Sequence, residues 1–203
     1  MNFNFDVFKR NVLSKVDKSK KGSFDEKIKS LCDTINSNNN FVTLSSCSGR
    51  ILLLKVPKNN KKFLSDWLFV THDKADVNVF FDVMKNFEKK VSVSDENFDE
   101  FDVFFKMEAA ILHVACKNKD FAFKLMDLAK KNGFRRVGLI SDRKNTVELI
   151  CNENVSIPIF DFKKKFFVIN KEQLSFFISK SNEKLEKSWN AINFLEREFK
   201  KVF

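Results

Sequence analysis

The sequence predicts an α+β protein in which helices pack on a mixed sheet, without a Rossmann fold. Three observations support this class. With 203 residues and 43% hydrophobic residues, the chain is long enough to bury a core. Stretches with the apolar spacing of helices are interspersed with short apolar runs typical of strands. The sequence contains no GxGxxG or P-loop motif of the kind that accompanies nucleotide-binding parallel sheets.

The order of the predicted elements suggests an internal duplication. Helix, hairpin, further strand and helix occur in this order in residues 1–92 and again in residues 103–203, although the two halves share negligible sequence identity. We therefore interpret residues 1–203 as a single domain built from two structural halves.

Two helices are predicted at the start of the chain. Apolar residues recur at helical spacing from Phe5 to Val16, which indicates a first short helix. Ser23 followed by Glu26 is a capping-box pattern and predicts that a second helix starts there. Its apolar stripe would consist of Ile28, Leu31, Cys32 and Ile35.

Strands follow in the first half. Residues 41–44 and 51–56 are apolar runs, and the short polar run between them predicts a tight turn that joins neighbouring strands. A third strand is expected over residues 67–71, and a helix containing residues 80–87 should follow it.

The second half begins with an apolar stretch, residues 103–116, which favours one or two buried strands. The next helix should end at Gly133, a residue type that suits the position just after a helix. Residues 137–140 and 147–151 indicate a hairpin, and a helix of about thirty residues should begin at Asn170.

Charge and cysteine usage restrict the class of protein. A net charge of +10 favours an anionic partner, and nucleic acid is the first candidate. The four cysteines show no spacing typical of a metal site, so we expect reduced thiols and no bound metal. The sequence has neither a signal peptide nor an apolar run of 18 residues, which predicts a soluble cytoplasmic protein without a membrane partner.

The run from Ser45 to Arg50, SSCSGR, is the strongest candidate for a binding site. Serine hydroxyls and backbone N–H groups in a turn can converge on one ligand. Gly49 permits a positive φ or a close backbone approach, and the planar guanidinium of Arg50 suits a carboxylate or phosphate. The alternative interpretation is an ordinary surface turn.

Other candidate residues lie outside this run. The basic link 17–22, DKSKKG, precedes a predicted helix N-terminus and could hold an anion, or it could be a solvated loop. His72 and His113 are the only histidines, at the end of one predicted strand and inside another. Each could be a core residue, or both could face one crevice. Lys106 and Glu108 could line that crevice, or Lys106 could mark an edge strand.

Five motifs resemble those of the tRNA wybutosine-synthesising protein 3 family, of the archaeal, single-domain type. They occur in the family's order and spacing: DKSKKGSFDEKI (17–28), SSCSGRI (45–51), WLFVTHD (67–73), ILHVACK (111–117) and NGFRRVGL (132–139). The sequence departs from the family pattern at Leu44, at Val137 and within residues 107–111, and the first two changes remove hydroxyl groups.

This resemblance implies an S-adenosylmethionine-dependent methyltransferase that methylates N4 of the tricyclic wyosine-type guanosine beside the anticodon of phenylalanine tRNA. It implies binding of the anticodon stem-loop. Asp25 and His72 are the predicted catalytic residues, with Asp17 as an alternative proton acceptor. Predicted cofactor or substrate contacts are Asp17, Ser19, Lys20, Gly22, Ser45, Ser46, Cys47, Ser48, Gly49, Arg50, Lys106 and His113. The main alternative is a noncatalytic RNA-binding or modification-complex subunit; a phosphate-binding enzyme is another.

Overall fold

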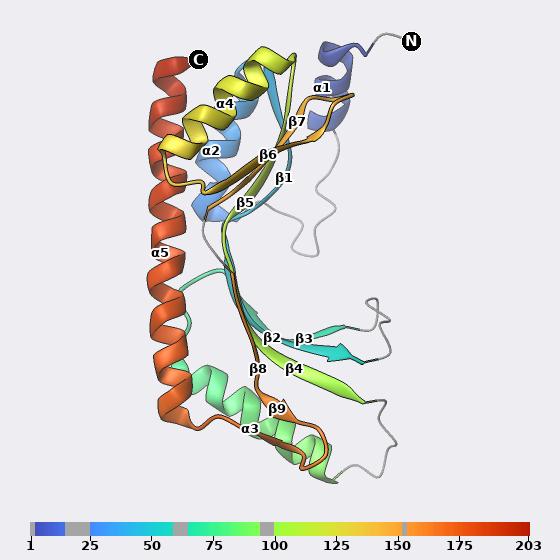
Figure 1. Cartoon of the computed structure of the whole chain (residues 1–203), viewed down its shortest axis with the longest axis vertical. Coiled ribbons are helices and arrows are strands. Elements are labelled where there is room, and N and C mark those ends of the chain that lie inside the picture. The colour runs from blue at the N-terminus through green and yellow to red at the C-terminus, as the bar shows by residue number, and fades with distance from the viewer. Residues whose placement is uncertain (1–2, 15–24, 59–64, 94–99, 152–153) are drawn as a thin grey trace. The chain divides into compact units, whose positions relative to one another are not determined.

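The computed structural model describes residues 3–14, 25–58, 65–93, 100–151 and 154–203. The chain divides into two compact units (Figure 1). Unit 1 consists of Met1–Gly49, Ala109–Asn152 and Glu186–Phe203, and unit 2 consists of Arg50–Glu108 and Glu153–Leu185. Each unit therefore takes segments from both halves of the sequence. The units are not the halves 1–92 and 103–203, and the predicted duplication is not confirmed.

Unit 1 contains a four-stranded sheet in the order β1-β5-β7-β6. Its strands are β1 (Phe41–Cys47), β5 (Ile111–Cys116), β7 (Thr146–Ile150) and β6 (Arg136–Ser141). Every neighbouring pair is antiparallel.

The two faces of the unit 1 sheet carry different helices (Figure 1). One face carries α2 (Glu26–Ser37) and α4 (Lys119–Lys131). The other carries α1 (Phe5–Leu13), whose buried Phe5 packs against Val42 and Ala115. Because side chains alternate across a strand, residues two apart from Ala115 on β5 share the face of α1.

Unit 2 contains the second four-stranded sheet, in the order β3-β2-β4-β8, again with antiparallel neighbours. Its strands are β3 (Asp66–Thr71), β2 (Arg50–Pro57), β4 (Phe101–Glu108) and β8 (Val155–Pro158). Further elements are α3 (Val77–Val93), the short strands β9 (Phe160–Asp161) and β10 (Phe166–Phe167), and α5 (Lys171–Val202) up to Leu185.

Phenylalanine rings pack together in the core of unit 2. Phe80 of α3 contacts Phe69 of β3 and Phe105 of β4, with ring centroids 4.8 and 6.0 Å apart. Phe105 in turn lies 6.1 Å from Phe177 of α5. Since Phe101, Val103, Phe105 and Met107 are all buried, the intervening residues of β4 face away from α3.

The α+β class is confirmed, but two details of the prediction are wrong. The strands form two four-stranded sheets and one two-stranded sheet (β9 and β10) rather than one mixed sheet, and all pairings among the described residues are antiparallel. Moreover, β1 and β2 are not hairpin partners. β1 pairs with β5, whereas β2 pairs with β3 and β4, so the chain crosses from one sheet to the other between them.

Helix positions agree better with the sequence. Asn118 caps α4, Gly133 after that helix has a φ of +96°, and α5 is 32 residues long. The capping box is wrong, because α2 begins at Glu26 with Asp25 as its N-cap, and Ser23 lies outside the described residues. Among the helices described, none combines the length and the apolar character needed to span a membrane.

Candidate functional site

The crossing after β1 is held by a buried polar network within unit 1. One carboxylate oxygen of Asp25, Oδ2, accepts hydrogen bonds from the backbone N–H and the hydroxyl of Ser48 at 3.0 and 3.3 Å. The Ser48 carbonyl accepts a hydrogen bond from the indole N–H of Trp189 at 3.1 Å. Ser48 is completely buried, so these partners satisfy groups that water does not reach.

Gly49 has the positive φ, +96°, that the sequence predicts for it. It is the last residue of unit 1, and Arg50 is the first of unit 2. On the neighbouring segment the chain passes between the units at Glu108 and Ala109. The motif SSCSGR is therefore a crossing between sheets and not the turn of a hairpin.

Three of the five motifs meet in one cross-strand row of unit 1. Ser45 of β1 pairs with His113 of β5, His113 pairs with Glu148 of β7, and Glu148 pairs with Gly138 of β6. The Ser45 Oγ lies 2.7 Å from His113 Nδ1, and His113 Nε2 lies 2.9 Å from Glu148 Oε2. A hydroxyl, an imidazole and a carboxylate are thus connected in series.

This row lies on the face of the sheet that carries α1, because His113 is two residues from Ala115. The row remains accessible: Ser45 is exposed, and the His113 and Glu148 side chains keep 26% and 35% of their surface exposed. A Cβ atom added at Gly138 would meet no atom within 4 Å, so there is open space beside Glu148. A ligand can therefore reach the polar atoms.

The hydrogen bonds determine the tautomer of His113. An ionised carboxylate can only accept hydrogen bonds, so the Nε2 atom of neutral His113 carries the proton that is donated to Glu148. The Nδ1 atom is then an acceptor, and the Ser45 hydroxyl donates to it. Consequently the Ser45 oxygen keeps lone pairs for a donor on a ligand.

In unit 2, a second set of motif residues comes together on β2, β3 and β4. Arg50 forms an ion pair with Glu108, which also contacts Lys106. The guanidinium of Arg50 lies over the indole ring of Trp67, 4.8 Å from its centroid. These residues place two cations, one carboxylate and one aromatic ring on adjacent strands.

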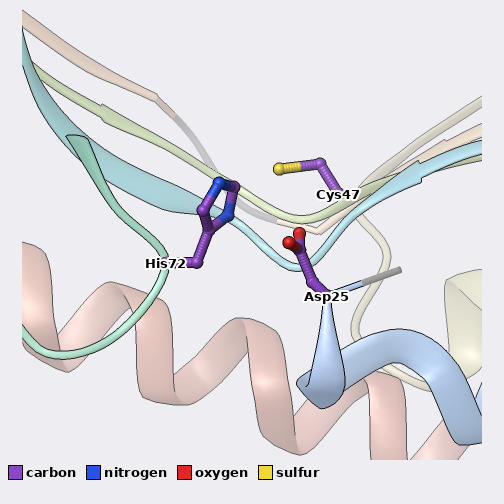
Figure 2. Close-up of side chains that lie close together, drawn as sticks. All are labelled: Asp25, Cys47 and His72. Atoms are coloured by element: carbon purple, nitrogen blue, oxygen red, sulfur yellow. The ribbon is translucent and has the colours of Figure 1, made fainter. Parts of the chain in front are cut away.

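Figure 2 draws the side chains of Asp25, Cys47 and His72, which come from three of the five sequence motifs. Asp25 lies at the N-terminus of α2 and Cys47 at the end of β1, and both belong to unit 1. His72 belongs to unit 2 and follows β3, as the sequence predicts. Cys47 is half-buried.

The other cysteines are buried structural residues. Burial raises the pKa of the Cys32 thiol to about 11, opposed by a hydrogen bond with the side chain of Ser46. Burial likewise raises the pKa of Cys116 and of Cys151 to about 12. These thiols stay protonated at neutral pH and are poor nucleophiles. The Ser46 side chain on β1 is thus hydrogen-bonded to Cys32 of α2.

Four predicted contact residues, Asp17, Ser19, Lys20 and Gly22, lie outside the described residues. Of the others, Asp25, Ser45, Ser46, Cys47, Ser48, Gly49 and His113 belong to unit 1, and Arg50, His72 and Lys106 belong to unit 2. The convergence of the two histidines on one crevice therefore remains a prediction.

Sequence reasoning missed Glu148, Trp67 and Trp189 as partners of the motif residues. The two tryptophans carried a signal, because they are the only ones in the chain and an indole N–H usually finds a hydrogen-bond partner when buried. Glu148 carried none, since its contact with His113 depends on strand pairing across 35 residues.

The fold and these two groups of polar residues define an α+β protein, distinct from Rossmann methyltransferases, with acid–base and charged groups on its sheets. The sequence matches the family described as Methyltransferase TYW3 over residues 8–201, and the chain belongs to this family.

Named relatives support the same family. A zebrafish (Danio rerio) tRNA wybutosine-synthesizing protein 3 homolog is 33% identical over 192 residues, which are 93% of this chain and 71% of the relative. A Methanocaldococcus jannaschii protein named tRNA(Phe) 7-((3-amino-3-carboxypropyl)-4-demethylwyosine(37)-N(4))-methyltransferase is 33% identical over 172 residues, which are 83% of this chain and 82% of that protein.

The fold also has a solved counterpart. The PH1069 protein from Pyrococcus horikoshii superposes with a TM-score of 0.81 at 26% sequence identity, covering 97% of this chain and 96% of that protein. The expectation that the fold is not a Rossmann fold is thereby confirmed.

Proposed function

We propose that this protein is an S-adenosylmethionine-dependent tRNA methyltransferase of the cytoplasm. Its substrate is the tricyclic wyosine-type guanosine on the 3′ side of the anticodon in phenylalanine tRNA, and its product is the N4-methylated base. Family membership and the name of the Methanocaldococcus jannaschii relative support this activity. The net charge of +10 suits the polyanionic tRNA.

One observation carries the proposal: the row Ser45, His113 and Glu148, in which residues from separate motifs form a hydrogen-bonded series. A ring nitrogen that accepts a methyl group must also lose a proton. The row contains a proton acceptor, His113, and a hydroxyl that can hand the proton on. These are the groups that the reaction requires from the protein.

The proton would move in two linked steps. The substrate N–H donates to the Ser45 oxygen, and the Ser45 hydroxyl proton passes to His113 Nδ1. The imidazolium that results is stabilised by Glu148 through Nε2. No charge is left on Ser45, and the nitrogen keeps its electron pair for the new bond to carbon.

The residues present suit the cofactor. S-adenosylmethionine, when bound, supplies a methyl group activated by a positively charged sulfur. Its methionine end carries a carboxylate and an ammonium group, and its ribose carries hydroxyls. Arg50 and Lys106 provide hydrogen-bond donors that complement the carboxylate. Catalysis would then rest mainly on holding the two reactants in line.

The roles predicted for Asp25 and His72 stay predictions. The Asp25 carboxylate accepts two hydrogen bonds from Ser48, which suits a positioning role at the crossing. We propose that His113 with Ser45 accepts the substrate proton.

The test is mass spectrometry of the anticodon-loop nucleoside of tRNA(Phe) that lacks the N4 methyl group, after incubation with the protein and S-adenosylmethionine. We expect a gain of one methyl group. His113→Gln should reduce kcat about a hundredfold, which is typical for loss of a general base. A rate within about threefold of the wild type would exclude the proposed relay.

A noncatalytic RNA-binding subunit is the alternative outcome. Such a protein would bind tRNA but show neither methyl transfer nor calorimetric binding of S-adenosylhomocysteine. Both results together would overturn the methyltransferase assignment.

A further inference from the structure

Unit 2 carries a charged cluster, which we define as Arg50, Lys106, Glu108 and the ring of Trp67. Arg50 Nε and Nη2 both lie 2.6 Å from Glu108 Oε2. Lys106 Nζ lies 3.1 Å from the other oxygen, Oε1. The strand register explains the arrangement, because Arg50 of β2 is the cross-strand partner of Glu108 on β4.

The charged cluster lies on the side of the sheet that faces away from α3. Phe105 and Met107 point into the core, so Lys106 and Glu108 point to the opposite face. Trp67 is 39% exposed, and the Arg50 guanidinium lies 4.8 Å from its ring centroid. The cluster thus combines an aromatic surface with groups of both charges.

Two cations share a single carboxylate in this cluster. Burial alone would raise the pKa of Glu108, but Arg50 and Lys106 outweigh it and hold the pKa below its usual range. Glu108 is therefore ionised, and the cluster keeps one positive charge in excess. The side chains of Arg50, Lys106 and Glu108 are each about a quarter exposed, at 26, 24 and 25%. Charges at this depth interact more strongly than fully exposed ones.

The cluster has hydrogen-bonding capacity beyond its internal contacts. A guanidinium has five N–H donors, an ammonium has three, and a carboxylate has about four acceptor positions. The contacts with Glu108 use two donors of Arg50 and one of Lys106. An additional carboxylate could bind the two cations, while an additional ammonium could bind Glu108.

We propose that the charged cluster binds an α-amino-acid group. The α-carboxylate would contact Arg50 and Lys106, the α-ammonium would contact Glu108, and the attached CH₂ groups would lie against Trp67. The inference rests on the proposed function, in which two reactants carry this group. One is the methionine end of S-adenosylmethionine, and the other is the 3-amino-3-carboxypropyl arm in the substrate name of the archaeal relative.

A purely structural role explains the cluster less well. The register of β2 and β4 is already fixed by eight cross-strand pairs and by the buried face of β4. The same strand pair has another ion pair at its far end, Lys58 with Glu100 at 2.8 Å. That pair is about half exposed, with side-chain exposures of 45 and 47%, and no aromatic ring among the described residues lies over Lys58. It is a matched control.

The experiment compares Glu108→Gln with Glu100→Gln in the full chain. Gln keeps the size and the acceptor oxygen but removes the charge that pairs with an ammonium. In the first measurement, calorimetry compares binding of S-adenosylhomocysteine with binding of 5′-methylthioadenosine, which lacks the amino-acid group. In the second measurement, kcat/KM is determined for tRNA with and without the 3-amino-3-carboxypropyl arm.

A methionine-end site predicts that Glu108→Gln weakens S-adenosylhomocysteine binding about tenfold or more and leaves 5′-methylthioadenosine binding unchanged. A substrate-arm site predicts unchanged cofactor binding and an equally large loss of the preference for arm-bearing tRNA. Glu100→Gln should change neither. Arg50→Lys, which keeps the charge but removes the planar fork, serves as the second variant if Glu108→Gln does not fold.

The proposal is overturned if folded Glu108→Gln or Arg50→Lys retains wild-type affinity for S-adenosylhomocysteine and the wild-type preference for arm-bearing tRNA. Failure of the proposed function gives a different result, namely that the wild-type protein methylates neither tRNA. Calorimetry still tests the charged cluster in that case.

Discussion

The role of Asp25 can be decided by comparing Asp25→Ala with Asp25→Asn. Alanine leaves the Ser48 N–H without the acceptor that now lies at 3.0 Å, and Ser48 is completely buried. An unpaired buried donor costs about 1–3 kcal/mol, and the upper part of that range applies here because the lost acceptor is charged. At about 2–4 °C per kcal/mol for a chain of this length, we expect Tm to fall by about 4–12 °C.

Asparagine retains a carbonyl oxygen that can accept the same hydrogen bonds. The free energy of unfolding of Asp25→Asn should therefore stay within about 1 kcal/mol of the wild type. If Asp25 positions the crossing, Asp25→Asn keeps its methylation rate within about threefold, whereas Asp25→Ala loses about tenfold through poorer positioning.

Differential scanning calorimetry and methyl transfer to tRNA measure the two effects. A catalytic base gives another pattern, because neither alanine nor asparagine accepts a proton at neutral pH. Both variants would then lose about a hundredfold or more in kcat. Equal loss in the two variants, with the Asp25→Asn protein fully folded, would refute the positioning argument.

Three further predictions concern stability and tRNA binding. Gly133→Ala should destabilise the protein by about 2–4 kcal/mol, because φ is +96° and the new Cβ would lie 2.9 Å from a Cβ of α5. Gly138→Ala meets no atom within 4 Å and should change the unfolding free energy by less than about 1 kcal/mol, so equal urea midpoints for the two variants would contradict the packing argument. Burial raises the pKa of Cys116 and Cys151 from the ordinary value of 9.0 to about 12, so native thiols hold their protons more tightly than unfolded ones. The stabilisation that the two thiols contribute is complete below pH 9 and is lost as the pH rises towards 12. The urea midpoint should therefore be lower at pH 10 than at pH 8. This difference should be smaller when both cysteines are replaced by alanine. Replacing the lysines of residues 17–22 should weaken tRNA binding and flatten its dependence on salt, whereas an unchanged salt slope would remove this link from the tRNA interface.

Local features of the fold could be predicted because they depend on neighbouring residues. The length of α5 follows from apolar residues at spacings of three and four, and the end of α4 follows from Gly133. The same holds for Gly49, whose positive φ needs a residue without a Cβ atom. These predictions require no knowledge of what packs against the helix or turn.

Strand partners could not be predicted in this way. The polar run 45–50 between two apolar strands is typical of a hairpin, but β1 and β2 find longer-range partners in β5 and β4. Both choices satisfy the backbone hydrogen bonds equally well, so the decision depends on which side chains each strand buries. The prediction of the hairpin used only the local pattern and was therefore wrong.

The same distinction between local pattern and strand pairing applies to the candidate site. Residue types with the right chemistry, such as His113 and Arg50, stand out in the sequence because they are rare or lie in a motif. Glu148 is an ordinary acidic residue in a strand, whereas Glu108 is already a candidate in the sequence. For both, only the cross-strand register shows which partner they have, an imidazole for Glu148 and a guanidinium for Glu108.

The register also explains why the spacing within SSCSGR matters. Cys47 pairs with Ile111 and Arg50 pairs with Glu108, so three residue steps separate these pairs on each of the two strand segments. Ser45 and Cys47 oppose His113 and Ile111 in one sheet, and Arg50 opposes Glu108 in the other. A hairpin would have opposed the two ends of SSCSGR to each other. The observed crossing instead gives Ser45 an imidazole and Arg50 a carboxylate, so six residues of sequence contribute to both the proposed proton relay and the charged cluster.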